Sequence, residues 1–440
     1  MATTSRFHSP LNVKFTNPLN LHSLLSISTA FTFPLIKRRN IELVCCLSIE
    51  GRTGRQNAAV KDESGGDIVV MFAAGGTGGH IYPALAIADE LRTRSPRTQI
   101  RFVGTPTGME STVIPSAGYD FSAVPAVPLA RPLFSPQNLF FFPYHLVKSL
   151  IASWRQLHDF SPQIVVGTGG YVSFPICLIA ALRGIKLVIQ EQNAAPGIAN
   201  RVLSYFADKI FVAFESTMEC FPQNKCVVCG NPIRFSLRQY MSKAVARIHF
   251  FPSSAKLGDS EAKVVLVLGG SLGSNTINIT LLNLYYQMLM EYDKLFIIWQ
   301  TGVATFDEME SLVKNHPRLI LKPFLHSMDM AYAAADLIIS RAGAMTCFEI
   351  LATGKPSILI PSPNVAEGHQ LKNASVMAAS AGSRVLMEDE LDSTTLEDVI
   401  KEILENDSLR AEMSEKALKA AKPNASAEIV EHILALATLS

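Results

Sequence analysis

Apolar residues along the chain fall into short runs that alternate with segments of helical periodicity. The run at 67–75 (DIVVMFAAG) is continuous and rich in β-branched residues, and the helical segment 81–94 follows its glycines. Further runs of this kind stand at 99–104, 163–170, 186–193 and 209–214. This alternation predicts a parallel sheet covered by helices.

The same order of elements restarts at Lys263, where strand, glycine-rich turn and amphipathic helix follow one another again. The two glycine-rich turns, at Gly75 and Gly269, lie 194 positions apart. We therefore predict an α/β protein with two doubly wound, Rossmann-like parallel-sheet domains. The predicted segments are a lead-in at 1–66, an N-terminal domain at 67–234, a C-terminal domain at 235–418, and a helix at 419–440 that could pack back on the N-terminal domain.

The first 41 residues hold five basic side chains and no acidic one, and ten of the first 36 residues are Ser or Thr. Such a start is typical of an organelle transit peptide, with a plastid favoured because hydroxyl residues outnumber Arg. The stretch LVCCLS (43–48) resembles a plastid processing site. The alternative is a plain disordered tail.

Composition narrows the function classes. The 440 residues are 48% hydrophobic and carry a net charge of +1, which gives no general basis for nucleic-acid binding. No apolar run approaches the roughly 18–20 residues of a spanning helix. Cys226 and Cys229 have the spacing of a metal or redox pair, but their Val-rich surroundings favour small apolar strand residues.

Glycine loops after strands predict an anion site. The amides of such a loop and the N-terminus of the next helix attract a phosphate. Two loops open the two halves, and a third lies in SRAGAMT (340–346). A dinucleotide oxidoreductase is the alternative, but no acid follows the strand QIRFVGT (99–105), and no Walker motif is present.

Two side chains are candidates for chemistry. His80 opens a helix, where the dipole disfavours imidazolium, so it could serve as a general base or simply bond to backbone. Glu349 follows a predicted helix start near Ala344, so it could accept both ribose hydroxyls, or it could be an ordinary exposed helical residue.

An aromatic stretch around residues 134–155 includes Phe140, Phe141, Phe142 and Trp154, with basic residues beside them. The pattern fits contact with an anionic membrane surface or a helix that faces the core.

Eight ordered motifs resemble the MurG family of glycosyltransferases. They are GGTGGHIYPALAIADEL, GTPTGMESTVIPSAGY, GTGGYVSFP, QEQNAAPGIANR, GNPIR, GGSLGSNTIN, SRAGAMTCFEI and PSPNVAEGHQLKNA. The resemblance runs from about Ile68 to the C-terminus. It implies a GT-B fold and transfer of N-acetylglucosamine, with inversion, from UDP-GlcNAc to a lipid-linked muramoyl-pentapeptide. No metal or other cofactor is implied. The implied location is the surface of a plastid inner envelope or thylakoid membrane.

The resemblance also implies roles for individual residues. His80 would be the base and Glu110 an acid on the acceptor side. Glu349 would take the ribose, Leu325 would read uracil through its backbone, and Gln370 would bind sugar hydroxyls. The remaining substrate contacts would be Thr77, Gly78, Gly79, Asn193, Arg234, Ser271, Ala344, Met345 and Thr346.

Two features depart from the bacterial pattern: Gln190 stands where many relatives carry His, and the leader has no bacterial counterpart. In a plastid, a galactolipid-type transferase that uses UDP-galactose and diacylglycerol is an alternative. A non-catalytic membrane scaffold is another.

Overall fold

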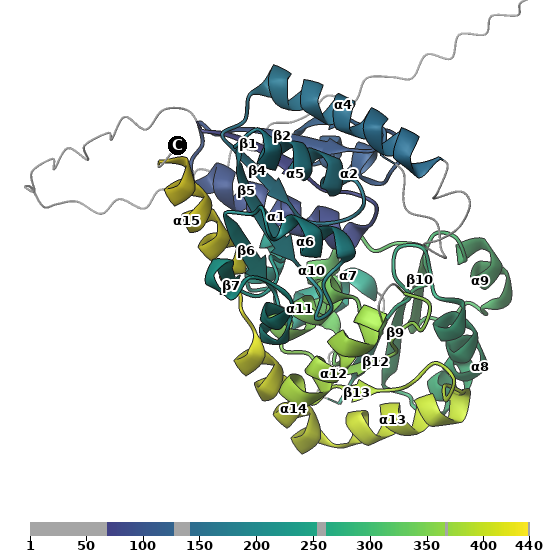
Figure 1. Ribbon diagram of the computed structural model, residues 1–440. Coiled ribbons are helices and arrows are strands. Elements are labelled where there is room, and N and C mark those ends of the chain that lie inside the picture. The colour runs from purple at the N-terminus through teal and green to yellow at the C-terminus, as the bar shows by residue number, and fades with distance from the viewer. Residues whose placement is uncertain (1–67, 127–140, 253–260, 366–367, 439–440) are drawn as a thin grey trace, which may run out of the picture. The chain divides into compact units, whose positions relative to one another are not determined.

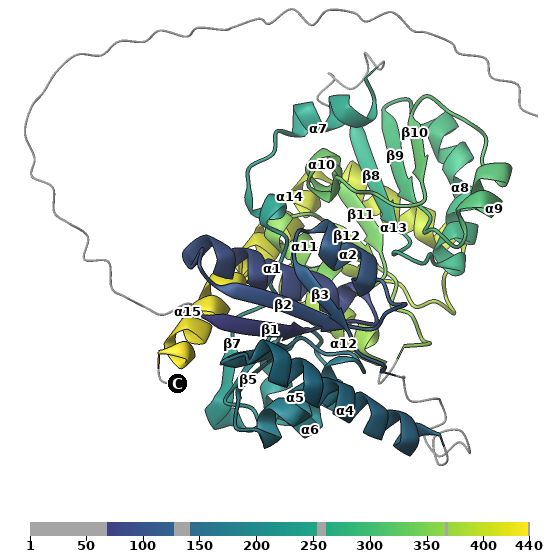
Figure 2. The same ribbon diagram turned by 90° about the horizontal axis from the view of Figure 1, so that it is seen from above.

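Both halves of the chain are built on a parallel sheet (Figures 1 and 2). The computed structural model describes residues 68–126, 141–252, 261–365 and 368–438, all within one unit, Glu63–Ser440. The N-terminal sheet has seven strands in the order β3-β2-β1-β4-β5-β6-β7, and the C-terminal sheet has six in the order β10-β9-β8-β11-β12-β13. The predicted fold class is confirmed. The predicted leader at 1–66 and Phe140 lie outside the described residues.

Short apolar runs form the N-terminal strands, as predicted. The strands are β1 (Val69–Ala73), β2 (Gln99–Gly104), β3 (Asp120–Ala123), β4 (Ile164–Gly167), β5 (Lys186–Glu191), β6 (Lys209–Val212) and β7 (Cys226–Val228). The α-helices are α1 (Gly78–Arg94), α2 (Glu110–Ser116), α4 (Phe142–Phe160), α5 (Ser173–Leu182) and α6 (Ile198–Leu203). Three short 3₁₀ turns follow at Glu215–Cys220, Gln223–Lys225 and Phe235–Arg238.

The C-terminal half repeats this plan. Its strands are β8 (Lys263–Leu268), β9 (Leu295–Gln300), β10 (Leu319–Lys322), β11 (Leu337–Ser340), β12 (Ser357–Leu359) and β13 (Arg384–Val385). Its helices are α7 (Lys243–Phe250), α8 (Asn275–Glu291), α9 (Phe306–Leu312), α10 (Met328–Ala334), α11 (Ala344–Thr353), α12 (His369–Ala381), α13 (Ser393–Glu405), α14 (Asp407–Ala420) and α15 (Ala425–Ala437). As predicted, α11 begins at Ala344. Gly354 ends this helix in the left-handed conformation.

Each central strand is buried on both faces. Successive side chains of a strand point to opposite faces, so Val70 and Phe72 join one core while Met71 and Ala73 join the other. Both sheets also reverse their strand order beside the first strand, between β1 and β4 and between β8 and β11. Ligands of open parallel sheets bind at the carboxyl ends of strands at such a switch point. The glycine loops predicted from the sequence follow these strands.

The chain returns to the N-terminal domain at its end. Helix α15 packs against α1, and its residues Ile429, Val430 and Ile433 lie in the same core as Ile81. Just before α15, the Lys422 ammonium donates to the Val228 carbonyl at the end of β7, at 3.1 Å. The last helix is therefore an integral part of the N-terminal domain.

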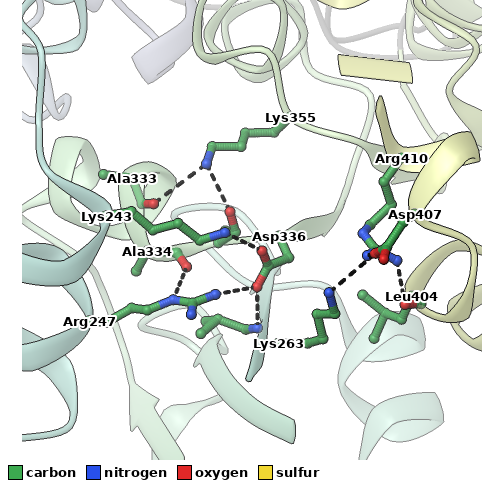
Figure 3. Close-up of polar contacts among 12 residues, drawn as sticks. Lys243, Arg247, Lys263, Ala333, Ala334, Asp336, Lys355, Leu404, Asp407 and Arg410 are labelled. Atoms are coloured by element: carbon green, nitrogen blue, oxygen red, sulfur yellow. Dashed lines mark hydrogen bonds and ion pairs between the residues drawn. The ribbon is translucent and has the colours of Figure 1, made fainter. Parts of the chain in front are cut away.

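A charge cluster holds α7 to the C-terminal sheet (Figure 3). The Asp336 carboxylate pairs with Arg247 and Lys243 of α7, each at 2.5 Å, and accepts the Val264 amide of β8 at 2.7 Å. Lys355 lies beside them and donates to the Ala335 carbonyl at 2.8 Å. Burial and the nearby cations lower the pKa of the Lys355 ammonium to about 8. The Asp336 carboxylate thus fixes α7, the first helix of the C-terminal domain, against β8.

Candidate functional site

A cavity of about 650 Å³ lies at the carboxyl ends of both sheets and is lined by residues of both domains. We call it the interdomain cavity. Its volume is in the range of sites for drug-sized ligands. It brings together twelve residues singled out from the sequence: Thr77, Gly78, Gly79, His80, Asn193, Arg234, Ser271, Ala344, Met345, Thr346, Glu349 and Gln370.

His80 lines the cavity from the first turn of α1. Its Nδ1 lies 2.9 Å from the Thr168 carbonyl oxygen and 3.1 Å from Oε1 of Gln192. Burial lowers the pKa of the imidazole, and these two hydrogen bonds oppose that shift in part. A neutral imidazole in this position can accept a proton near pH 7.

Two glycines allow the loop after β4 to pack closely against the His80 ring. A Cβ at Gly169 would lie 2.9 Å from Nδ1 of His80, and a Cβ at Gly170 would lie 2.3 Å from the Gly75 carbonyl oxygen. Both glycines have positive φ values, +96° and +82°. The loop after β4 can therefore close over the ring only because these positions lack side chains.

Glu110 lies beneath the first glycine loop and does not line the cavity. Its side chain is fully buried and accepts hydrogen bonds from the Gly76 amide at 3.2 Å, the Thr105 amide at 2.9 Å and the Thr105 hydroxyl at 2.6 Å. These hydrogen bonds lower the pKa of the carboxyl against the opposing effect of burial. The structure places this carboxylate as a support for the loop.

Glu349 is buried, at 3% exposure, so the alternative of an ordinary exposed helical residue is wrong. Oε2 accepts the Tyr332 hydroxyl at 2.9 Å. Oε1 lies 3.5 Å from Nε of Arg234 and has no hydrogen-bond partner in the part of the chain that the structure describes. The Arg234 guanidinium stacks on the Tyr82 ring at 4.2 Å. A buried acceptor without a donor, on a cavity wall, is suited to a ligand hydroxyl.

On the side of the cavity that the C-terminal domain supplies, which we call the C-terminal wall, the lining includes the N-termini of two helices. The first intrahelical bond of α11 runs from the Cys347 amide to the Gly343 carbonyl, so the amides of Ala344, Met345 and Thr346 precede the hydrogen-bonded turns. The loop that holds Ser271 leads into α8, which Ser274 caps. Two helix dipoles therefore end at the cavity and favour an anion there.

The other predicted contacts lie in or near this wall. Gln370 accepts the Ser362 amide at 2.9 Å. Leu325 does not line the cavity, and its amide donates to Oε1 of Gln300 at 3.0 Å, while Phe324 beside it does line the cavity. Asn193 contacts Asn373 of α12 at 3.3 Å across the domains.

Sequence reasoning missed several lining residues: Tyr82, Met109, Gln192, Gln300, Phe324, Arg341, Ser362 and His369. Gln300 had a usable signal, because it ends the buried strand β9 at the carboxyl edge of the sheet. Tyr82 and Gln192 lay inside quoted motifs, but only the fold brings them beside Arg234 and His80.

Helix α4 presents apolar side chains outward, so the alternative of a helix with its aromatic residues in the core is wrong. Tyr144, Val147, Ile151 and Trp154 are each at least half exposed, and they recur along one side of the helix. Its buried residues are Ser149, Ser153 and Leu157. Phe141 is also exposed, whereas Phe142 is half-buried. Among the described residues, no helix has the length and apolar character needed to cross a membrane.

Within the described ranges, no group of three or more His, Cys, Asp or Glu side chains is placed so that it could hold a metal ion. Cys226 and Cys229 are free thiols on and beside β7. Burial raises the pKa of the Cys229 thiol to about 12, which keeps it protonated and unreactive.

The chain matches two family descriptions. Residues 70–212 match "Glycosyltransferase family 28 N-terminal domain" and residues 264–429 match "Glycosyltransferase family 28 C-terminal domain". Curated proteins named "UDP-N-acetylglucosamine--N-acetylmuramyl-(pentapeptide) pyrophosphoryl-undecaprenol N-acetylglucosamine transferase" are similar along most of their length. The protein from Salinibacter ruber is 40% identical over 84% of this chain and 96% of its own. The protein from Flavobacterium psychrophilum is 40% identical over 83% and 97%.

Solved structures agree with these matches. The MurG crystal structure from Acinetobacter baumannii is 29% identical, with a TM-score of 0.63, over 83% of this chain and 99% of that one. The calicheamicin glycosyltransferase CalG4 is 16% identical, with a TM-score of 0.61, over 84% and 98%, and shares the fold.

Proposed function

Because the chain belongs to the MurG family of glycosyltransferases, we propose that it transfers N-acetylglucosamine from UDP-GlcNAc to a lipid-linked N-acetylmuramyl-pentapeptide. Family membership confirms the resemblance and the GT-B fold predicted from the motifs, and it makes the oxidoreductase alternative wrong. The observation that carries the proposal is the interdomain cavity, which is lined by a half-buried histidine from one domain and by helix N-termini and a buried carboxylate from the other.

The C-terminal wall is suited to a nucleoside diphosphate. The Glu349 carboxylate would accept the ribose hydroxyls, since its Oε1 has no hydrogen-bond donor among the described residues. The amides at the start of α11, the Thr346 hydroxyl and the Ser271 loop would bind the diphosphate. Charge that develops on the leaving diphosphate would thus meet fixed dipoles, a role that a metal ion has in other transferases.

The side of the cavity that belongs to the N-terminal domain supplies the base, His80. Nε2 of His80 would take the proton from the acceptor hydroxyl as its oxygen bonds to the sugar's anomeric carbon. The bond from that carbon to the diphosphate oxygen would break, and UDP would leave with the electron pair. One displacement of this kind inverts the anomeric centre. Arg234 and Gln370, which both line the cavity, would orient the donor.

The lipid-linked acceptor requires a membrane surface, and the apolar face of α4 is suited to one. We define the α4 face as Tyr144, Val147, Ile151 and Trp154, with Lys148 exposed beside them. Each large apolar side chain that leaves water contributes about 1.5–3 kcal/mol. The expected contact is peripheral, with anionic lipid.

Binding and turnover test the proposal. Protein beginning at Asp67 should bind UDP-GlcNAc by calorimetry more tightly than UDP-galactose, UDP-glucose or NAD, and it should transfer the sugar to the lipid-linked acceptor. A preference for UDP-galactose with diacylglycerol as acceptor would indicate galactolipid synthesis instead. No binding of any nucleotide sugar would favour the non-catalytic scaffold.

A separate experiment tests the membrane contact. Flotation with phosphatidylglycerol vesicles should recover the wild type, and Ile151→Ser with Trp154→Ser should lower the partition coefficient by about a hundredfold, or about 3 kcal/mol. The matched control is Ile279→Ser with Met290→Ser, two exposed apolar residues on α8. Equal loss in both pairs would remove the α4 face as the contact.

We also propose a plastid location, on the charge and hydroxyl pattern of residues 1–41. Residues 1–66 fused to a fluorescent protein should enter plastids, while the protein beginning at Asp67 should not. Entry into mitochondria, or a cytosolic signal from both, would refute this.

A further inference from the structure

The environment of the His80 ring determines which of its nitrogens is basic. The Thr168 carbonyl oxygen, 2.9 Å from Nδ1, can only accept a hydrogen bond. Nδ1 must therefore carry a proton, and in the neutral ring Nε2 holds the free lone pair.

The Gln192 side chain leads to the same result independently. Its Nε2 lies 2.6 Å from the Thr168 carbonyl and 3.3 Å from the Gln190 carbonyl. Since carbonyls only accept, this end of the amide must be the NH₂ group. Oε1 then faces Nδ1 of His80 at 3.1 Å and accepts its proton.

Gln192 is itself fixed by a chain of buried amides. Its Nε2 also donates to Oε1 of Gln190, whose own Nε2 donates to Oδ1 of Asn231 at 2.9 Å. Gln190, Gln192 and Asn231 are each at most 1% exposed. Asn231 belongs to the segment 229–234, which follows β7 and ends at Arg234. Uncharged groups therefore connect the ring to the segment between the domains.

We infer that Gln192 is a positioning residue for the reaction: with the Thr168 carbonyl, it holds His80 with Nδ1 protonated and Nε2 as the basic nitrogen. The inference rests on the proposed function, in which His80 is the base. Gln190 keeps the Gln192 amide from turning over. If the amide turned over, its NH₂ group would face Nδ1–H and the hydrogen bond would be lost.

Electrostatics make this role measurable. Burial lowers the pKa of His80, and its hydrogen bonds to Thr168 and Gln192 raise it. Other ionisable side chains line the same cavity or lie beside the first glycine loop and Gln192: Tyr82, Glu110, Tyr171, Glu191, Arg234, Arg341, Glu349 and His369. Glu191 is occupied by Asn200 and by the Gly197 amide. None of the described carboxylates is among the groups that shift the His80 pKa, so a carboxylate at position 192 would add an anion beside the ring and favour imidazolium.

The test is Gln192→Glu, with the pH dependence of kcat/KM as one readout and ¹⁵N-histidine NMR as the other. The acidic limb of the profile and the NMR titration of His80 should both move to higher pH by at least one unit. Gln163→Glu is the matched control, because this exposed glutamine keeps its acceptor bond to the Val69 amide and lies at the opposite edge of the sheet. It should leave both unmoved.

A second variant tests the inference if Gln192→Glu folds poorly. Gln192→Met keeps the side-chain length without polar atoms, so kcat should fall at least tenfold while the Kd of UDP-GlcNAc stays within threefold. NMR of the wild type should show Nδ1–H on neutral His80, with the signal identified by its loss in His80→Ala.

An Nε2–H tautomer in the wild type, or an unmoved His80 titration in Gln192→Glu, would overturn the inference. These spectra need no turnover, so they separate the inference from the proposed function. Protein with the expected spectra but no transfer from UDP-GlcNAc would refute only the function.

Discussion

Glu349→Ala is the sharpest test of the donor site. Among the described residues, Oε2 accepts one hydrogen bond, from Tyr332, whereas Oε1 lies buried on the cavity wall without one. Two ribose hydroxyls that donate to this carboxylate would each contribute about 1.5–3 kcal/mol, as hydrogen bonds to a charged group. Because Arg234, 3.5 Å away, already offsets part of the charge, we take a total of about 2–4 kcal/mol.

The expected result is a Kd for UDP-GlcNAc that rises about 30- to 1000-fold. Calorimetry without acceptor measures this directly, and thermal unfolding checks that the variant folds. Tyr332→Phe is the comparison, since it removes one donor to Oε2 but keeps the carboxylate. It should weaken binding by about 1 kcal/mol.

A donor without the ribose 2′-hydroxyl makes the test specific to the contact. The 2′-deoxy analogue should bind the wild type about tenfold or more weakly than UDP-GlcNAc, while Glu349→Ala should not distinguish the two. A Kd within threefold of wild type in Glu349→Ala, or an equal penalty for the analogue in both proteins, would refute the assignment of this carboxylate to the ribose.

Three further predictions concern the base, the His80 loop and the α7 cluster. His80→Ala should lower kcat at least a hundredfold with donor Kd within threefold, and an equal loss of donor binding would move His80 to the donor site. Gly170→Ala places a Cβ 2.3 Å from the Gly75 carbonyl oxygen, so kcat should fall and the free energy of unfolding should drop by about 2–4 kcal/mol. The control is Gly184→Ala, at a position with φ +71° and open space around it, which should lower the free energy of unfolding by only about 1–2 kcal/mol. Equal effects of the two variants would contradict this prediction. The unfolded state binds more protons than the folded state above pH 8, because burial lowers the Lys355 pKa to about 8. Chemical denaturation should therefore show a rise of about 2 kcal/mol from pH 8 to 10 that Lys355→Met lacks, and the same slope in both proteins would exclude this lysine.

The fold could be predicted from the chain because its signals are local. Continuous β-branched runs indicate strands buried on both faces, and glycines after a strand indicate a tight turn at its carboxyl end. These patterns led to two parallel sheets. Gly354 could likewise be recognised as a helix end, because a left-handed residue after a helix favours glycine.

The site was predictable to the extent that ligand contacts come from strand ends and helix starts. Thr346 and Ser271 are of this kind. The contacts of Glu110 were not predictable in this way: its motif indicated a role on the acceptor side, but in the structure its carboxylate accepts hydrogen bonds from the Gly76 and Thr105 amides beneath the loop. A sequence motif identifies a residue but does not show which atoms its side chain contacts.

The sequence by itself determined the two-domain α/β plan, the strands and loops that carry the site, and the family. Only the tertiary structure decided burial and contacts between distant residues. It buried Glu349 and turned the apolar side of α4 outward. It also brought His80 within hydrogen-bonding distance of Gln192, 112 positions away. The physical reason is that periodicity reports which side of an element is apolar, whereas solvent exposure and the protonation of a ring nitrogen depend on what other segments place against it.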